Sequence, residues 1–346
     1  MMKSLCIVST QMQLLNSIEL LQRIESENNE LVIIAPSITR RKQIEATLKL
    51  LELGFIFEKV TIIEPKYKHS LFNSFHYKKQ IRRTLSGYAH FDSLVISNYK
   101  EITIRYSYYC IWKKNPYIKT FIVDDGLSIY EIIERRNKEL KKKEASINLH
   151  SRHLVFVYPN SKLKDCIASK LVFFTNHEIK EKPKVDTIMC NDYRNLKNIV
   201  SRNIQFNDKC RICIIGQPLP QIGVLNKDTY CDCLDSFINH FGGESETINY
   251  IPHPTEFISD NLDDRIRNRV TIVRLDLPIE IYSLKFSSDI VVVSFYSAAL
   301  NNIHRIRPEI KIYCIYPIIE FETNSIVKNA YASLISAGIE AFKITK

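Results

Sequence analysis

Short apolar runs alternate with amphipathic stretches along most of the chain, and this alternation limits the possible fold more than any other feature of the sequence. The runs are rich in valine and isoleucine and are bounded by polar turn residues, which is typical of buried strands. In the first half we expect strands over Leu5–Ser9, Leu31–Pro36, Val60–Ile63, Ser93–Ser97, Thr120–Val123, Leu154–Val157 and Leu171–Phe174, with helices over Leu14–Arg23, Gln43–Leu51 and Lys79–Leu85. Such alternation predicts right-handed βαβ units around a parallel sheet.

The polar, basic segment 176–209 interrupts this pattern, and we expect only one short helix in it, near Tyr193–Val200. A second series follows, with strands over Arg211–Ile215, Ile248–Ile251, Val270–Arg274, Ile290–Val293 and Ile310–Ile315 and helices over Tyr230–His240, Pro278–Phe286, Ala298–His304 and the tail Ser325–Ala341. The sequence therefore predicts an α/β protein with Rossmann-like domains over 1–185 and 210–346 and a linker over 186–209. Ligands of such domains bind at the carboxyl ends of the strands, so we expect a cleft between the two domains.

Size and glycine content narrow the class of protein further. The chain has 346 residues, 45% of them hydrophobic and 25% charged, which is enough for two domains and ordinary for a globular protein. Only 8 glycines are present, and no Gly-x-Gly occurs. This excludes the dinucleotide-binding fingerprint and the Walker A loop.

The formal net charge of +10 is distributed unevenly. Residues 1–150 hold 24 basic and 16 acidic side chains, whereas residues 151–346 hold 24 and 22. The first half therefore carries +8 and the second +2, which favours an anionic partner for the first half: a nucleic acid, a membrane surface or an acidic saccharide.

Cysteine usage and hydropathy predict the compartment. Several of the nine cysteines lie in apolar runs, among them Cys6, Cys213 and Cys314, as buried thiols of a reducing compartment do. The sequence contains no run of about 18 apolar residues that would span a membrane. We therefore expect a cytoplasmic protein, with attachment to the inner face of the cytoplasmic membrane still compatible with this pattern.

Three motifs end or follow predicted strands. Asp124-Asp125-Gly126 follows the strand ending at Val123, where a carboxylate could accept a proton from a sugar hydroxyl or could cap a helix. His253 stands between Pro252 and Pro254, in a loop with little backbone freedom, and histidine suits proton donation or phosphate contact near neutral pH.

The third motif is Ser294-Phe295-Tyr296-Ser297, where serines at a helix start can bind an anion or simply cap the helix. Upstream of it, Glu280 in the first turn of a helix could bind a ribose diol or only complement the helix dipole. Each of these signals is weak alone, but their order along the chain is more specific.

This ordered set resembles the bacterial sialyltransferases, most closely glycosyltransferase family 52, which includes lipooligosaccharide sialyltransferases. Those families share an acidic Asp/Glu-Asp/Glu-Gly motif, a His-Pro motif and a serine-bearing motif, here Asp124–Gly126, His253-Pro254 and Ser294–Ser297. The family also tends to have Gly-x-Pro after a strand that opens the second domain, here Gly216-Gln217-Pro218.

The resemblance implies a GT-B fold, two Rossmann-like domains facing across a cleft, and metal-independent, inverting transfer from CMP-sialic acid with no cofactor. It makes His253 the phosphate contact and general acid, Glu280 the ligand of the cytidine ribose, and Ser294 and Ser297 ligands of the phosphate or the sialic acid carboxylate. The residues implied in substrate binding are Asp125, Gly126, Gly216, Gln217, Pro254, Glu280, Ser294, Tyr296 and Ser297.

The general base has two candidates. Related families use the first carboxylate of the acidic motif, here Asp124, whereas family 52 uses an aspartate soon after Gly-x-Pro. This chain departs from that pattern, because Leu219 follows Pro218 and the next aspartate is Asp228. We favour Asp228 slightly; inverting transfer needs one base at the acceptor hydroxyl, so only one of the two should be essential.

Three competing interpretations remain. Cys210, Cys213, Cys231 and Cys233 lack a zinc-ribbon spacing, so we expect no metal. The basic stretches around Lys78–Arg83 and Ile132–Lys143 could bind nucleic acid, but they lack interleaved aromatic residues, and a solvated helix face or a contact with anionic lipid explains the second one more simply. The resemblance also covers some hexosyltransferases that use other nucleotide sugars, and such a hexosyltransferase is the third interpretation.

The resemblance thus predicts a membrane-peripheral sialyltransferase that forms an α-2,3 linkage to a galactoside of a lipopolysaccharide, lipooligosaccharide or capsule precursor. The resemblance also allows a homodimer. In a GT-B enzyme the second domain holds the nucleotide, so the basic first half would face an anionic glycolipid acceptor or a membrane surface rather than nucleic acid.

Overall fold

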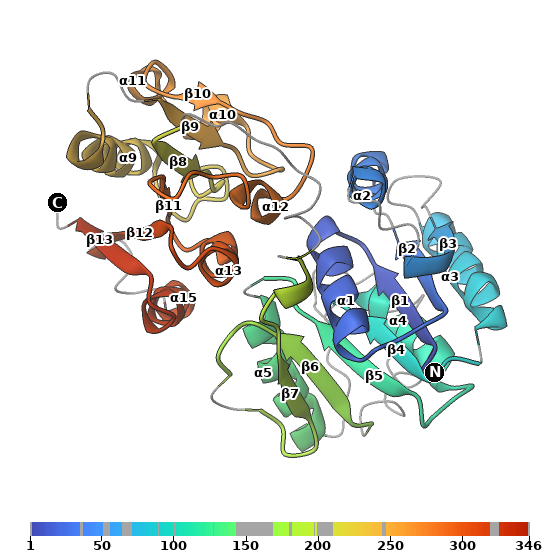
Figure 1. Cartoon of the computed structure of the whole chain (residues 1–346). Coiled ribbons are helices and arrows are strands. Elements are labelled where there is room, and N and C mark those ends of the chain that lie inside the picture. The colour runs from blue at the N-terminus through green and yellow to red at the C-terminus, as the bar shows by residue number, and fades with distance from the viewer. Residues whose placement is uncertain are drawn as a thin grey trace. The chain divides into compact units, whose positions relative to one another are not determined.

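The chain divides into two compact units, Met1–Leu196 and Lys197–Lys346, each built on one parallel sheet (Figure 1). The computed structural model describes residues 2–34, 37–50, 56–63, 71–88, 90–99, 101–126, 128–142, 169–179, 182–196, 198, 210–243, 247–318 and 325–344. The predicted strand Leu154–Val157 lies outside the described residues.

The first unit has a sheet in the order β3-β2-β1-β4-β5-β6-β7. Its strands are β1 (Ser4–Val8), β2 (Asn29–Ile34), β3 (Phe57–Ile63), β4 (Ser93–Ile96), β5 (Lys119–Val123), β6 (Leu171–Thr175) and β7 (Thr187–Cys190). The five central strands are almost entirely buried, which explains their near-continuous apolar sequences. This is the doubly wound order, and it reverses between β1 and β4.

The helices of the first unit connect these strands. They are α1 (Gln11–Arg23), α2 (Ile38–Leu50), α3 (Leu71–Thr84) with the short 3₁₀ helix η2 (Leu85–Gly87), α4 (Ile102–Trp112) and α5 (Ser128–Lys142). The hydroxyl of Thr10 caps α1 by accepting a hydrogen bond from the Gln13 N–H, 3.3 Å away. Right-handed connections place α1 and α4 on opposite faces of the sheet (Figure 1).

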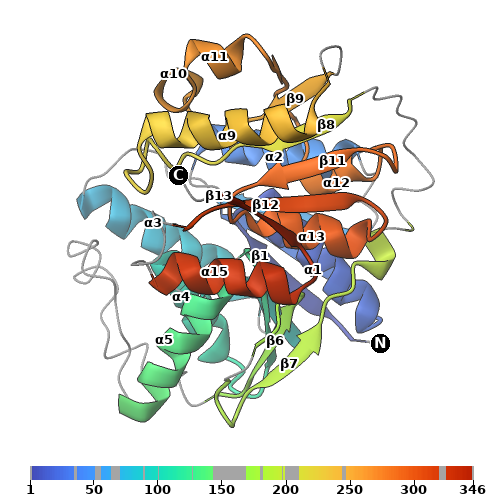
Figure 2. The ribbon, with the colours of Figure 1, turned by 90° about the vertical axis from the view of Figure 1, so that its left-hand side faces the viewer.

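The second unit repeats this plan with the order β10-β9-β8-β11-β12-β13. Its elements are β8 (Ile212–Ile215), α9 (Lys227–Phe241), β9 (Ile248–Ile251), α10 (Ile258–Asn261), α11 (Asp264–Arg267), β10 (Thr271–Ile272), α12 (Ile279–Ser283), β11 (Val291–Ser294), α13 (Ala298–Ile306), β12 (Lys311–Pro317), α15 (Ser325–Ser336) and β13 (Glu340–Ile344). Figure 2 shows β8, β11 and β12 side by side, as their parallel pairing requires.

Two strands were not expected from the sequence. Strand β7 lies inside the stretch predicted to be the linker, and it pairs with β6 as the edge of the first sheet. The tail predicted as one helix over Ser325–Ala341 is instead α15 followed by β13, which pairs with β12. Gly338, with φ +95°, ends the helix by taking a conformation that residues with a Cβ rarely adopt.

A buried carboxylate holds the end of the first unit in place. Residues 194–196 are helical, within the short helix expected near Tyr193–Val200. Glu19 of α1 is buried and accepts hydrogen bonds from the backbone N–H groups of Asn195 and Leu196. Burial raises the pKa of Glu19, and these hydrogen bonds oppose that rise.

Helix α5 contributes one residue to each of two buried ion pairs, in a stretch that the sequence predicts to be a solvated face. Arg136 is fully buried and donates to both carboxylate oxygens of Asp186, at 3.0 and 3.1 Å. Glu139 is equally buried and accepts from Arg105 of α4 at 2.8 Å. The prediction of a solvated face or lipid contact for the whole of 132–143 is therefore wrong for these two positions, although Lys138 is exposed.

One edge strand in each sheet, β3 and β10, has a feature that disfavours pairing with a further strand. In β3, the exposed Glu58 and Lys59 interrupt the apolar pattern, and Lys59 lies 3.7 Å from Glu30 of β2. In the second sheet, the edge strand β10 has only two residues. Across the described ranges, the structure shows no helix with the length and hydropathy that crossing a membrane requires.

Candidate active site

Predicted site residues of the second unit meet where its strand order reverses. The reversal falls between the neighbouring strands β8 and β11. Gly216 and Gln217 directly follow β8, and Ser294 is the last residue of β11. The carboxyl ends of parallel strands at such a reversal are the usual place for ligands in doubly wound sheets.

The side chain of Gln217 spans this reversal. Its Oε1 accepts hydrogen bonds from the Tyr296 N–H at 3.0 Å and from the Ser294 hydroxyl at 3.3 Å. Ser294 is fully buried, and its Oγ also lies 2.6 Å from the carbonyl oxygen of Ile215. The hydroxyl of Ser294 is therefore engaged within the loops themselves, whereas Tyr296 and Ser297 are partly exposed.

Ser297 is the N-cap of α13. Its hydroxyl accepts a hydrogen bond from the Ala299 N–H at 3.3 Å. Of the two roles considered for Ser297, anion binding and helix capping, its hydrogen bond shows the capping role. The positive end of the α13 dipole lies at the same sheet edge as Gln217.

His253 lies in the loop that follows β9, the other neighbour of β8. The ring is exposed, as is Pro254 beside it. Its Nδ1 accepts from the Thr255 N–H at 3.3 Å and lies 2.8 Å from the Thr255 hydroxyl. Because a backbone N–H can only donate, the neutral ring carries its hydrogen on Nε2, which can then donate to an anion.

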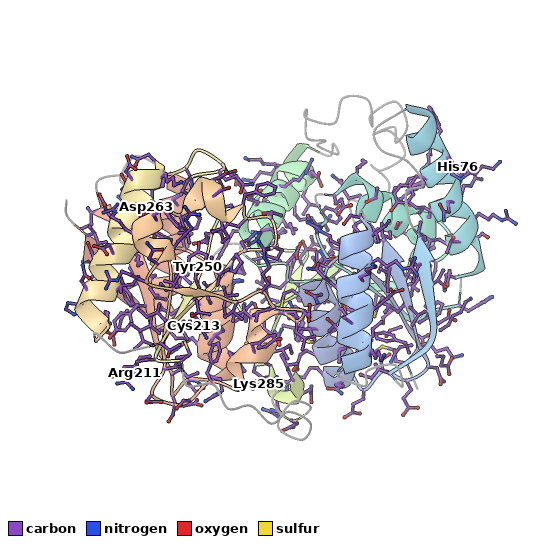
Figure 3. The ribbon with its side chains drawn as sticks, turned by 90° about the horizontal axis from the view of Figure 1, so that it is seen from above. His76, Arg211, Cys213, Tyr250, Asp263 and Lys285 are labelled. Carbon is purple, nitrogen blue, oxygen red and sulfur yellow. The ribbon has the colours of Figure 1, made fainter. Side chains whose placement is uncertain are left out.

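Three buried residues under this loop, Tyr230, Tyr250 and Glu256, were given no role in the site from the sequence. The carboxylate of Glu256 accepts from the His253 N–H at 2.9 Å and from the Tyr250 hydroxyl, and the Tyr230 and Tyr250 hydroxyls lie 3.0 Å apart. Tyr250 points into the interior of the second unit (Figure 3). Burial is the main reason that the pKa of Glu256 is raised.

Gly216 is the residue that makes room for this group. A Cβ at position 216 would come within 2.4 Å of Glu256 Oε2 and 2.5 Å of Tyr250 Oη. Position 216 therefore requires glycine because the backbone there lies close to these two side chains.

Glu280 and Asp228 occupy different environments. Glu280 lies in the first turn of α12, as predicted, and is buried, with its Oε1 accepting from the Asn302 side chain of α13 at 2.8 Å. Asp228 lies in the first turn of α9 and is exposed, while Asn226 provides the N-cap of that helix. Of the two, only Asp228 presents its carboxylate to solvent.

In the first unit, Asp124 and Asp125 follow β5 as predicted, and Gly126 turns the chain with φ +71°. The side chain of Asp124 is buried; its Oδ2 accepts from the Thr175 hydroxyl at 2.7 Å and lies 3.7 Å from His177 Nε2. Burial raises the pKa of Asp124, against the opposing effect of His177. This environment suits a positioning role more than contact with a substrate.

Asp125 is the more exposed of the two carboxylates. Its oxygens accept from the Gln13 side chain at 2.9 Å and the Thr10 hydroxyl at 3.3 Å, both at the start of α1. Glu101, at the N-terminus of α4, has a pKa raised chiefly by burial and further by the charge of Asp125. The first unit thus gathers carboxylates at the carboxyl edge of its sheet.

Comparisons with known proteins address the fold. No protein-family model and no curated protein sequence matches the chain. Among solved structures, Staphylococcus aureus MnaA bound to UDP matches with a TM-score of 0.54 and 12% identity, over 97% of this chain and 88% of that one. LpCGTa in complex with UDP matches with a TM-score of 0.51 and 9% identity, over 99% and 84%.

A third match is the Glycyrrhiza uralensis protein UGT73P12 complexed with glycyrrhetinic acid 3-O-monoglucuronide, with a TM-score of 0.50 and 8% identity, over 100% of this chain and 81% of that one. At such identities the likeness concerns the fold alone. It extends over both parallel-sheet units, and the chain has the GT-B fold expected from the sequence.

Proposed function

We propose that the chain is a glycosyltransferase that moves sialic acid from CMP-sialic acid to a galactoside, without a metal and with inversion. The acceptor would belong to a lipopolysaccharide, lipooligosaccharide or capsule precursor. The GT-B fold and the order of the three motifs support this proposal. Contact with an anionic membrane surface and formation of a homodimer stay predictions.

The observation that carries the proposal is the exposed His253 ring beside the reversal point of the second sheet. With Nδ1 engaged by Thr255, its Nε2 can donate to an anionic leaving group. The partly exposed Tyr296 and the start of α13 lie at the same sheet edge, and the helix dipole there favours an anion such as a phosphate. Buried Glu280 would contact the ribose only through a side-chain rearrangement.

Asp228 fits the role of base better than Asp124. A base has to come within about 2.6–3.2 Å of the acceptor hydroxyl, directly or through one water. The carboxylate of Asp228 is exposed, whereas that of Asp124 is buried against Thr175 and His177. We therefore propose Asp228 as base, with Asp124 supporting the loop that carries Asp125.

The first test is ligand binding and transfer. CMP should raise the Tm, because a ligand that binds only the folded state stabilises it by mass action. The variant His253→Ala should keep its fold, by circular dichroism, and lose transfer from CMP-sialic acid by about 10²–10⁴-fold, the usual contribution of general acid–base catalysis. A fully active His253→Ala enzyme would exclude the proposed mechanism.

The base is tested by measuring Asp228→Asn and Asp124→Asn side by side. Loss of transfer in Asp228→Asn, with its Tm unchanged, supports Asp228 as base. Loss of transfer only in Asp124→Asn, without loss of stability, would assign the role to Asp124 instead.

A second candidate function is transfer from a nucleoside diphosphate sugar. Two of the matched structures, MnaA and LpCGTa, hold UDP, which favours a diphosphate donor. A rise in Tm with UDP but not with CMP, together with hydrolysis or transfer from a UDP-sugar, would select this candidate. Salt-dependent DNA binding without any nucleotide effect would contradict both.

A further inference from the structure

Hydrogen bonds link the three loops at the carboxyl edge of the second sheet into one series. The Gln217 N–H donates to the Tyr230 hydroxyl at 3.2 Å, and the Tyr230 and Tyr250 hydroxyls lie 3.0 Å apart. Tyr250 in turn donates to Glu256 Oε1. The loop after β8 is thereby connected to the loop after β9, and the side chain of Gln217 extends the series to the loop after β11.

Both ends of this series fix its direction. The backbone N–H of Gln217 can only donate, and the hydroxyl of Tyr250 donates its one proton to Glu256 Oε1. Tyr230, which receives the Gln217 N–H, therefore donates to Tyr250, and Tyr250 donates to Glu256. At the other carboxylate oxygen, the N–H of His253 donates to Glu256 Oε2 at 2.9 Å.

The series is also buried and closely packed. Tyr230 and Tyr250 are fully buried and Glu256 is 3% exposed, so water does not compete for these groups. Tyr230 stacks on Phe295 of the loop after β11, with ring centroids 4.8 Å apart. Gly216, which has no Cβ, allows the backbone after β8 to lie close to the Glu256 carboxylate.

We propose that Glu256, together with Tyr250, is a positioning residue that holds the backbone of His253 in register with the loops after β8 and β11. This inference rests on the proposed function, in which the ring of His253 meets the departing phosphate. Glu256 itself would not touch the substrate. It would act by fixing where the imidazole stands relative to Tyr296 and the start of α13.

Replacement of Glu256 by glutamine is a sharp test because the amide cannot satisfy the series. Glutamine offers one acceptor and one donor group, whereas both neighbours, the Tyr250 hydroxyl and the His253 N–H, donate. If the amide oxygen faces His253, its NH₂ meets Tyr250, whose proton must then turn toward Tyr230. Tyr230 then accepts that proton and loses Tyr250 as the acceptor for its own, so one donor always remains without an acceptor.

The experiment compares Glu256→Gln and Tyr250→Phe with the control Tyr88→Phe. Tyr88 is buried in the first unit and its hydroxyl contacts that of Thr61 at 3.0 Å, so the control removes a comparable hydroxyl far from these loops in sequence. Two readouts are taken: amide hydrogen exchange of residues 251–258, and transfer kinetics with CMP-sialic acid.

Exchange at His253 should accelerate about tenfold or more in Glu256→Gln, since the backbone N–H loses a carboxylate acceptor or shares it with an added donor. The kcat should fall about tenfold or more in the same variant, while the KM for the donor changes less than about threefold. Tyr250→Phe should show smaller changes of the same kind. Tyr88→Phe should leave both readouts as in the wild type.

The outcomes separate the inference from the proposed function. Unchanged exchange at 251–258 in Glu256→Gln and Tyr250→Phe would overturn the positioning role, and so would a loss of activity that equals the loss in Tyr88→Phe. If the wild type transfers from no nucleotide sugar, the proposed function fails while the exchange readout still decides whether Glu256 holds the loop. If Glu256→Gln does not fold, Tyr250→Phe, which keeps the carboxylate, decides alone.

Discussion

At the scale of single residues, Gly216 shows how a glycine can be required by its neighbours rather than by its backbone angles. Its Cα faces the Glu256 carboxylate and the Tyr250 hydroxyl at a distance that excludes any Cβ. Both neighbours are buried and hydrogen-bonded, so neither can retreat without breaking the series that it belongs to.

We therefore expect Gly216→Ala to lower the free energy of unfolding by about 1–3 kcal/mol, the usual cost of overpacking a closed site. Gly87→Ala is the matched control, because a Cβ at Gly87 meets nothing within 4 Å. It should change stability by less than about 0.5–1 kcal/mol. Urea unfolding measures both; equal stabilities of the two variants would contradict the close approach.

The partners of the motifs are what the sequence could not supply. Asp124, His253 and Ser294 were found because each ends or follows an apolar run, which is a local pattern. Glu256 and Tyr250 were overlooked as partners because their roles depend on Gly216 and Tyr230. Both of those residues lie at least 20 positions earlier in the chain. Only the folded sheet brings them together.

At the scale of elements, α5 illustrates how a charged sequence can be half core. Lys138 and Glu134 form an exposed i,i+4 pair, whereas Arg136, midway between them in sequence and so on the other side of the helix, is fully buried against Asp186 of the segment before β7. Both positions look alike in the sequence, since charge alone does not reveal which side chain has a distant buried partner.

We expect Asp186→Asn to destabilise the protein by about 3–5 kcal/mol, because it leaves the Arg136 guanidinium buried with its charge unbalanced. On the same helix, Glu134→Gln removes one partner of an exposed pair and should cost less than about 0.5 kcal/mol. Thermal or urea unfolding of both variants provides the comparison. Similar costs for the two would mean that Arg136 finds solvent or another partner.

Strands β7 and β13 are the two strands that the sequence did not predict. The run Thr187–Cys190 is four residues long and half-exposed, so it is too short to stand out from its polar, basic surroundings. In the tail, Gly338 separates α15 from β13, but the apolar spacing across it mimics one continuous helix. The longer buried strands, in contrast, were predicted close to their observed bounds.

At the scale of the whole molecule, each unit closes a hydrophobic core of its own. One core gathers the side chains of β1, β4 and β5 with α4 and α5, and the other those of β8, β11 and β12 with α9 and α13. The two cores draw on separate parts of the chain, which is the condition for separately cooperative folding.

Calorimetry should therefore resolve effects on one unit from effects on the other. Asp186→Asn should lower the transition of the first unit, and CMP should raise that of the second, where His253 and α13 lie. Limited proteolysis at intermediate temperature should then release one intact unit. A single transition that shifts with either change would show instead that the units unfold together.

The short β10 and the charged residues of β3 also bear on how copies of this protein meet one another. An open strand edge offers unpaired N–H and C=O groups to any extended segment nearby, and so can template aggregation. Glu58 and Lys59 make docking on β3 costly, because an added strand would have to bury both charges. At β10, a strand from another molecule could pair with only two residues. Crowding these molecules together should thus promote little fibril growth from either edge.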